Sequence, residues 1–354
     1  MSVTSQAYLN TRITAMSTRL LACEQVSALA QLSLPELAER LQLQTLLDDQ
    51  LSKHSKSRAV EQSLIRLLLA ELAVLIRPMT PPEHGLIMSW GRKYALFNLK
   101  TLIRGKLYDL DQAEIRENLY DLPDNLGLTS HQELFRAENV LELLRTLEQG
   151  PYRLIARQAR EVYERKRDPF ALEAAIDQRY YAELMRQATQ LQDENAQPLR
   201  QLLGAILDRV DLLWLLRFRF SYRLSPSETF YQLVPSPKLL HRDRLLKLAN
   251  LETFEQMLEA LPAPLDGLLA GSASLIDAQR RVGAHQVAEA RRILASGRSG
   301  VARALAYLVL REGDLLVLFS LVQGRLLGLP QELIEIGIEL AEPNCAIGSL
   351  TAAA

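Results

Sequence analysis

The sequence predicts an all-α fold, and three observations support this prediction. Hydrophobic residues make up 48% of the 354 residues and charged residues 23%, whereas aromatic residues make up only 6%. Leu, Ala, Arg, Glu and Gln dominate and runs of β-branched residues are scarce, which favours helix over sheet. Signals for the start of a helix recur along the whole chain. The length allows two or three domains with substantial cores.

Four apolar segments look like copies of one helical pattern: Tyr8 to Leu21, Tyr94 to Leu110, Asp211 to Pro226 and Asp314 to Pro330. Each segment is apolar around most of its circumference but carries a few Asn, Lys, Arg or Asp residues, which is typical of a helix buried among helices. The turns that end the last three copies lie roughly 105 to 115 residues apart. We therefore expect three similar helical lobes, over residues 1–110, 111–224 and 225–354, with a frayed tail at the end of the third.

Further helices start in order along the chain, most of them at a capping box. In this motif a Ser, Thr or Asp side chain at the N-cap and a Glu three residues later satisfy each other's backbone donors. The expected pairs are Ser33 with Glu36, Thr80 with Glu83, Asp111 with Glu114, Ser130 with Glu133, and Ser225 with Glu228. Two more starts are marked by proline, namely Asp168 followed by Pro169, and Pro330 followed by Glu332.

Charge and cysteine content exclude some classes of protein. The net charge is −1 and the pI is about 6.6, whereas a nucleic-acid-binding protein usually has a basic surface. The two cysteines, Cys23 and Cys345, lie at opposite ends of the chain and form no metal-binding pair. No signal peptide is recognised, so we expect a reducing, cytoplasmic location and two free thiols, with a disulfide between them as the alternative.

No apolar segment is expected to cross a membrane. The most apolar candidate, residues 207–224, contains two aspartates and four arginines. Each charge at the centre of a bilayer costs about 2.5 to 3.5 kcal/mol. The segment from Leu315 to Gly324 is uncharged but spans only about half of the ~20 residues that a membrane helix needs.

A search for catalytic motifs finds none that is convincing. Gly297-Arg298-Ser299-Gly300 lacks the spacing and the lysine of a phosphate-binding loop, and no HExxH metal motif occurs. The five histidines are scattered over expected helix ends and loops. Glu173 and Asp177 lie one helical turn apart, but without a neighbouring histidine we interpret them as an ordinary salt-bridged or solvated face. We predict no catalytic, cofactor-binding or metal-binding residue.

Basic residues inside the apolar segments are the stronger candidates for function. Lys93, Lys100 and Arg104 have helical spacing that puts them along one face of a helix, and Arg217 and Arg219 lie in a later copy of the pattern. Such residues are seldom fully buried unless they are paired. They either face an internal cavity, as a socket for a partner protein, or form buried ion pairs.

The second interpretation, that of buried ion pairs, specifies which residues would pair. Arg217 or Arg219 would contact Asp208, Asp211 or Asp314 inside the protein. In that case the charges would have a structural role and would leave the partner-binding residues unidentified.

Five motifs, taken in order along the chain, resemble a known family. They are YLNTR at 8–12, NLKTLIRGKLYDL at 98–110, DPFALEAAIDQRYY at 168–181, DLLWLLRFRFSYRLSPSE at 211–228 and QGRLLGLP at 323–330. They are similar to motifs of the C subunit of the archaeal and bacterial A/V-type ATPases, whose eukaryotic relative is the d subunit of the vacuolar ATPase. The resemblance covers nearly the whole chain, from residue 8 to about residue 335.

The resemblance implies a three-lobed, all-helical protein with pseudo-threefold symmetry around a central funnel. Such a protein is non-catalytic and holds no cofactor. It sits on the cytoplasmic side of the membrane rotor ring, at the inner face of the cell membrane, and receives the foot of the central stalk in its funnel. Its function would be to transmit torque between stalk and ring for H⁺ or Na⁺ transport or for ATP synthesis.

This chain departs from the family pattern at two places. Leu318, Phe319 and Ser320 stand where the last copy usually has a polar core, and Ser236 and Pro237 stand where paired glycines are usual. The third lobe is therefore expected to pack differently or to contact a divergent partner. The alternative function is a stand-alone helical adaptor that binds another elongated partner, since a fold alone does not determine function.

Overall fold

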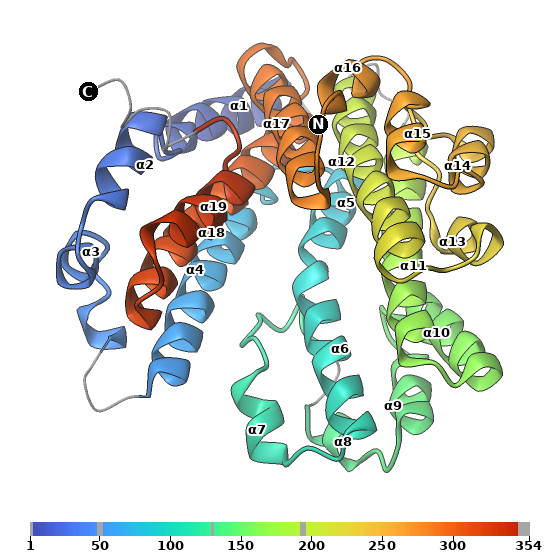
Figure 1. Ribbon diagram of the computed structural model, residues 1–354. Coiled ribbons are helices and arrows are strands. Elements are labelled where there is room, and N and C mark those ends of the chain that lie inside the picture. The colour runs from blue at the N-terminus through green and yellow to red at the C-terminus, as the bar shows by residue number, and fades with distance from the viewer. Residues whose placement is uncertain (1–2, 48–51, 129–130, 192–195, 346–354) are drawn as a thin grey trace. The chain divides into compact units, whose positions relative to one another are not determined.

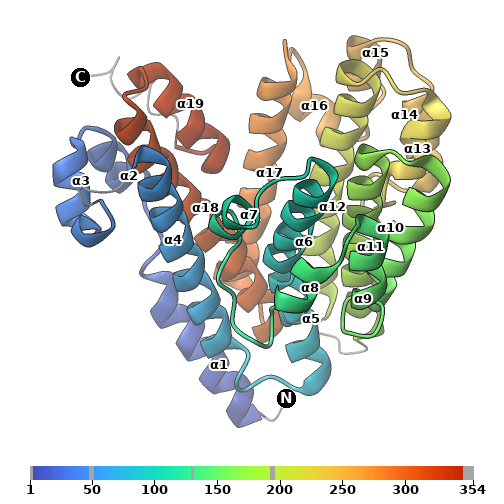
Figure 2. The ribbon, with the colours of Figure 1, turned by 90° about the horizontal axis from the view of Figure 1, so that it is seen from below.

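The computed structural model describes residues 3–47, 52–128, 131–191 and 196–345, and no strand occurs among them. The predicted all-α class is therefore confirmed. The chain divides into two compact units (Figures 1 and 2), one formed by Met1–Met79 together with Gln192–Ala354, the other by Thr80–Leu191. The division into three lobes over 1–110, 111–224 and 225–354 stays a prediction.

The first unit contains the two ends of the described chain. Its N-terminal helices are α1 (Val3–Ser17), α2 (Cys23–Ala30), α3 (Leu34–Arg40) and α4 (Lys53–Leu75). Its later helices are α12 (Ala196–Leu216), α13 (Pro226–Gln232), α14 (Arg242–Ala249), α15 (Phe254–Glu259), α16 (Leu265–Leu269), α17 (Leu275–Ser296), α18 (Gly300–Leu327) and α19 (Gln331–Ala341). A short 3₁₀ turn at Gln44–Leu46 and a π-helical turn at Arg217–Ser221 complete it.

Helix α18 forms the centre of the first unit. Its residues are buried on all sides over most of its length, because α4, α17 and α19 pack against it (Figure 1). The Ser299 hydroxyl accepts a hydrogen bond from the Ala302 amide at the start. The helix ends at Gly328, whose φ of 69° lies in the left-handed region that glycine adopts without strain.

The second unit is a continuous stretch of helices: α5 (Pro81–Gly91), α6 (Lys93–Leu107), α7 (Gln112–Glu117), α8 (His131–Arg136), α9 (Val140–Leu147), α10 (Arg153–Lys166) and α11 (Pro169–Gln190). Helices α9, α10 and α11 lie side by side (Figure 2), and α11 also packs against α5 and α6. Only two residues connect α10 to α11, and such a short connection favours antiparallel packing of neighbouring helices.

Most of the predicted helix starts are confirmed. Ser33, Thr80 and Ser225 are N-caps whose amides donate, as predicted, to the carboxylate of the glutamate three residues later. Asp168 accepts hydrogen bonds from two amides of the first turn of α11. Asp111 is the N-cap of α7 without a side-chain cap bond, so that capping box was wrong in detail. Pro330 is itself the N-cap of α19, and Ser130 lies outside the described residues.

Two glycines repeat the same packing contact in different parts of the chain. A Cβ atom on Gly105 would lie 2.7 Å from Cγ1 of Ile115, and one on Gly324 would lie 2.5 Å from Cγ1 of Ile334. In both cases the isoleucine comes ten residues after the glycine and belongs to the next helix. The glycine therefore lets α7 approach α6, and α19 approach α18, more closely than any other residue would.

We expect Gly105→Ala to destabilise the second unit by about 1–2 kcal/mol, although alanine in a helix interior normally gains up to ~1 kcal/mol over glycine. Adding Ile115→Val should recover part of the loss, because it removes the Cδ1 methyl group that would lie closest to the new Cβ but retains the γ carbon behind it. Denaturant unfolding in a Trp214→Phe background would measure this, since Trp90 is then the single tryptophan and lies in the second unit.

Gly85→Ala supplies the control for this experiment. Gly85 lies inside α5, and a Cβ there would meet nothing within 4 Å. Its substitution should leave the free energy of unfolding unchanged or increase it. If both alanine substitutions lowered the free energy of unfolding equally, close helix packing would not explain the need for glycine at position 105.

The expectation of two free thiols was wrong. Cys23 and Cys345 form a disulfide with a Cα–Cα distance of 5.1 Å, across a sequence separation of 322 residues. The chain segment after α19 returns to the start of α2, a contact that the sequence does not reveal. Disulfides are uncommon in reducing compartments, so the cysteines give no support to a cytoplasmic location.

The described helices were also compared with the requirements for crossing a bilayer. None of them combines the length and the apolar character that a membrane-spanning helix needs.

Candidate functional site

The five basic residues selected from the sequence lie in two separate units. Lys93, Lys100 and Arg104 belong to α6 of the second unit. Arg217 and Arg219 belong to the π-helical turn that follows α12 in the first unit. Their role in binding a partner stays a prediction, but the structure shows what each side chain contacts.

Lys100 and Arg104 connect α6 to α11 through ion pairs. The Lys100 ammonium lies 2.8 Å from an Asp177 carboxylate oxygen, and the Arg104 guanidinium forms two parallel hydrogen bonds of 2.6 Å to Glu173. The side chain of Arg104 is 52% exposed, so this pair contributes at most about 1 kcal/mol to stability. The interpretation of Glu173 and Asp177 as a salt-bridged face is confirmed.

Lys93 has a different environment. Its ammonium group lies 3.7 Å from the centroid of the Trp90 ring and 5.3 Å from that of Tyr94. A cation over an indole face is favourable by about 0.5–1 kcal/mol at a partly exposed site. Lys93 therefore fixes the junction between α5 and α6.

Arg217 and Arg219 do not form the ion pairs that the second interpretation required. Exposed Arg217 donates to the Gln279 side chain at 3.2 Å. Arg219 donates to the carbonyl oxygens of Leu224 and Leu251, at 2.7 and 3.1 Å. The predicted pairing of these arginines with aspartates inside the protein was wrong. Arg219 holds the turn after α12, whereas Arg217 remains accessible to another molecule.

The buried aspartates of α12 bind backbone amides instead. Asp208 accepts hydrogen bonds from the amides of Leu239 and Leu240, and Asp211 accepts one of 2.9 Å from the amide of Val234. One oxygen of each carboxylate has no hydrogen-bond partner. Burial raises the pKa of both carboxyl groups, that of Asp211 the more strongly. These residues fix the segment between α13 and α14.

Asn98 has the same role in α6. It is 1% exposed, accepts a 2.7 Å hydrogen bond from the Tyr120 amide and donates a 2.8 Å bond to the Tyr120 carbonyl. Asn98 binds a residue 22 positions later and Asp211 a residue 23 positions later. The recurring polar positions of the apolar segments thus hold the chain that follows each helix, a role that the sequence pattern did not reveal.

Glu71 of α4 is the centre of a buried polar network that sequence reasoning missed. Its carboxylate accepts a 2.7 Å hydrogen bond from the Tyr307 hydroxyl and pairs with Arg311 at 3.3 Å and Arg19 at 3.4 Å. Burial and the contact with Glu71 raise the pKa of Tyr307. The network connects α4, α18 and the end of α1. Only its glutamate within an apolar stretch of helix was visible in the sequence.

Asp314 of α18 lies near this network. Its carboxylate accepts a 3.1 Å hydrogen bond from the Leu21 amide and lies 3.7 Å from Arg311. The charge of Glu342 raises the pKa of Asp314, and the charge of Arg291 lowers it. Burial raises the pKa of Asp314 to about 7.

This shift predicts a contribution to stability that depends on pH. Asp314 binds a proton more tightly in the folded state, so its contribution is largest below about pH 4 and is lost as the pH rises towards 7. The Asp314→Asn variant keeps an oxygen that accepts from Leu21 but does not titrate. Its stability relative to wild type should therefore rise by about 1–4 kcal/mol between pH 4 and pH 8. Parallel denaturant titrations would measure the difference, and a constant offset between the two proteins would contradict it.

Comparison with known proteins gives one consistent result. The sequence profile of the ATP synthase (C/AC39) subunit family matches residues 9–336. The C subunit of the A-type ATP synthase of Methanosarcina mazei is 24% identical over 225 residues, which is 63% of this chain and 61% of that protein. Its counterpart in Methanosphaera stadtmanae is 25% identical over 59% of this chain and 53% of its own length. That of Methanocaldococcus jannaschii is 28% identical over 45% of this chain and 39% of its own length. The matched segments thus span less than two thirds of these relatives.

Proposed function

Because this chain belongs to the ATP synthase (C/AC39) subunit family, we propose that it is a non-catalytic subunit of a rotary ATP synthase or ATPase. It would act as a socket that joins the central stalk to the membrane rotor ring and transmits torque for H⁺ or Na⁺ transport or ATP synthesis. The observation that carries this proposal is the family match over nearly the whole chain.

The contacts within each unit support a mechanical role. Torque transfer requires a body that does not deform, and closely packed helices supply such stiffness. Ion pairs between α6 and α11 and the buried network around Glu71 connect helices that are far apart in the sequence. Among the described residues, no group of three or more His, Cys, Asp and Glu side chains is arranged to hold a metal ion.

We also propose that the three lobes over 1–110, 111–224 and 225–354 are repeats of one unit. The matching contacts of Asn98 and Asp211, and of Gly105 and Gly324, support this. In the assembled enzyme the lobes would surround a funnel for the central stalk, and the opposite face would contact the rotor ring. The protein would then be peripheral to the inner face of the cell membrane.

The proposed contacts with the stalk are made by Lys93, Lys100, Arg104, Arg217 and Arg219, which differ in availability. Arg217 is exposed and has one neutral partner, so it is the leading candidate. Lys100 and Arg104 already neutralise acidic groups of α11 and would have to share them with an incoming partner. Such charges affect orientation and association rate more than final affinity.

Calorimetric binding of the purified chain to the recombinant central-stalk subcomplex, at low and at moderate salt, tests the proposal. We expect a one-to-one complex that weakens as salt increases. Neutralising Lys100, Arg104, Arg217 and Arg219 together should slow docking and reduce its dependence on salt. Failure to bind at either salt concentration, with the ring present as well as absent, would contradict the socket function.

Two variants separate direct contacts from the exposure of acidic groups. Lys100→Met with Arg104→Gln leaves Asp177 and Glu173 without their partners. Adding Asp177→Asn and Glu173→Gln removes those charges too. If the basic residues contact the stalk, both variants bind slowly; if only the uncovered acids interfere, the second variant recovers. Arg145→Gln with Arg157→Gln, which removes two exposed arginines of the second unit, is the control for net charge.

A further inference from the structure

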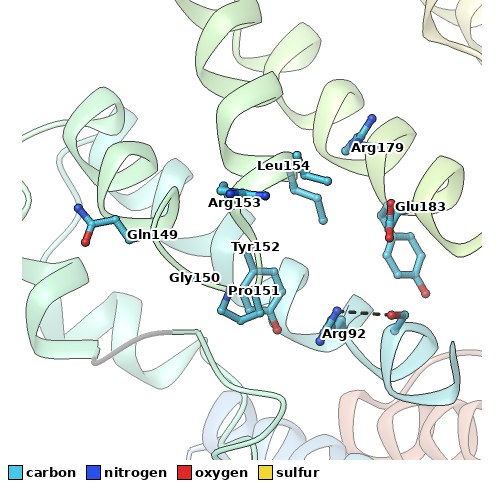
Figure 3. A pocket seen from close by; sticks show the side chains of 12 residues that line it. Arg92, Gln149, Gly150, Pro151, Tyr152, Arg153, Leu154, Arg179 and Glu183 are labelled. Carbon is cyan, nitrogen blue, oxygen red and sulfur yellow. Dashed lines mark hydrogen bonds between the residues drawn. The ribbon is translucent and has the colours of Figure 1, made fainter. Parts of the chain in front are cut away.

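The second unit contains a pocket of about 280 Å³ whose lining is rich in arginine. Arg92, Arg153 and Arg179 line it, together with one acidic residue, Glu183. Figure 3 shows that these residues come from separate segments: the junction of α5 and α6, the first turn of α10, and α11. The pocket lies within one compact unit, so its geometry depends on no other part of the chain.

The three guanidinium groups have few partners among the described residues. Arg92 makes one long hydrogen bond of 3.4 Å to the Ser89 hydroxyl (Figure 3), and its guanidinium carbon lies 6.0 Å from the centroid of the Tyr152 ring. The Nε of Arg179 is buried and has no hydrogen-bond partner. Arginine donates through five N–H groups, and leaving buried donors without acceptors is costly.

The single acidic residue of the lining is hydrogen-bonded to residues outside the lining, and Arg179 also attracts its charge. Glu183 accepts two hydrogen bonds from Arg186, of 2.9 and 2.5 Å, and another from Gln187. These contacts lower the pKa of Glu183, so it remains ionised, but one carboxylate does not balance three arginines. The lining therefore has an excess of positive charge, which favours the binding of an anion.

The remaining walls indicate what kind of anion would fit. Tyr152, which is 2% exposed, and buried Tyr180 are held by hydrogen bonds to the backbone oxygens of Leu126 and Trp90. Their rings, with Leu154 and Ile155, give the pocket an apolar side. Helix α10 also begins here with no side chain capping its first amides, which adds positive potential.

We propose that this pocket binds a phosphate group, either as free phosphate or as the phosphate of a small organic ester. Guanidinium groups bind phosphate oxygens through paired hydrogen bonds, and three of them match a dianion better than a single carboxylate. The pocket is larger than a bare phosphate and has an apolar wall, so it accommodates an organic group beside the anion. This site is independent of the proposed socket function.

Isothermal titration of the full chain with inorganic phosphate and with phenyl phosphate, at constant ionic strength, tests the proposal. We expect saturable one-to-one binding with a Kd on the order of 0.1–1 mM. Tighter binding of phenyl phosphate would identify an organic ester as the ligand class, and equal binding would identify free phosphate. Acetate and chloride at the same ionic strength should give no saturable signal.

Three substitutions assign the binding to this pocket. Arg92→Gln and Arg179→Gln should each weaken phosphate binding at least tenfold. Arg153→Gln changes an exposed side chain, so it should weaken binding without affecting folding. Arg157→Gln, one helical turn further along α10 and outside the lining, should leave the Kd within twofold of wild type. No binding of either probe up to about 10 mM, equal binding of acetate, or equal losses in Arg157→Gln would overturn the proposal.

Discussion

Glu71→Leu should destabilise the first unit by about 3–5 kcal/mol, the largest loss that we expect from any single polar substitution in this protein. Glu71 is 4% exposed and is the shared partner of Tyr307 and Arg311, which are themselves buried. Leucine fits the volume but leaves the Tyr307 hydroxyl in the interior without an acceptor and the Arg311 guanidinium without its nearest carboxylate. Denaturant unfolding in a Trp90→Phe background would measure this loss through Trp214, which lies in the first unit.

Glu71→Gln provides the matched control. Glutamine retains an oxygen for the Tyr307 hydroxyl but removes the charge that balances Arg311. Glu71→Gln should therefore lower the free energy of unfolding by less than Glu71→Leu does. If leucine and glutamine cost the same, the charge rather than the hydrogen bonds holds the network together; if neither costs more than about 1 kcal/mol, the network is not important for folding.

Asn98→Leu should destabilise the second unit by about 2–4 kcal/mol. Both polar atoms of the Asn98 side chain bind the backbone of Tyr120, and leucine would leave that amide and carbonyl unsatisfied in the interior. The stacked rings of Phe97 and Tyr120, whose centroids are 4.4 Å apart, would also lose their fixed geometry. The measurement is unfolding monitored by Trp90 in a Trp214→Phe background.

Asn118→Ala serves as the comparison in the same unit. Half-buried Asn118 donates to the Glu114 carbonyl in a hydrogen bond that is exposed to water, and water can replace this bond. We expect a loss of no more than about 0.5 kcal/mol. Similar losses from the two asparagines would show that burial of the Asn98 contact adds nothing to its strength.

Some predictions made from the sequence were confirmed by the structure and others were wrong, and the reason can be named for individual residues. Ser33, Thr80, Asp168 and Ser225 were found because a cap acts within one helical turn, so its partners are adjacent in the sequence. The interpretation of Glu173 and Asp177 as a salt-bridged or solvated face also followed from their spacing. The helical class followed from composition together with the recurring signals for the start of a helix.

Apart from the capping box at Asp111, the errors concern contacts between different segments of the chain. One of the two interpretations paired Arg217 and Arg219 with buried aspartates, yet these arginines bind a glutamine and two carbonyl oxygens. Both kinds of partner were equally compatible with the helix pattern. The Glu71 network was missed because its members come from three segments, and even its most local contact, with Arg19, joins residues 52 positions apart in the sequence.

The sequence by itself determined the helical class, most helix starts, the repeated apolar segments and the family, because these depend on local spacing and on motifs read in order. Only the tertiary structure decided which buried charges pair, that Cys23 bonds to Cys345, and that three arginines from separate segments line one pocket. The physical reason is that charge, hydrogen-bond and disulfide partners are selected by proximity in space. Packing of the apolar faces sets that proximity, and many arrangements of the same helices satisfy the sequence pattern equally well.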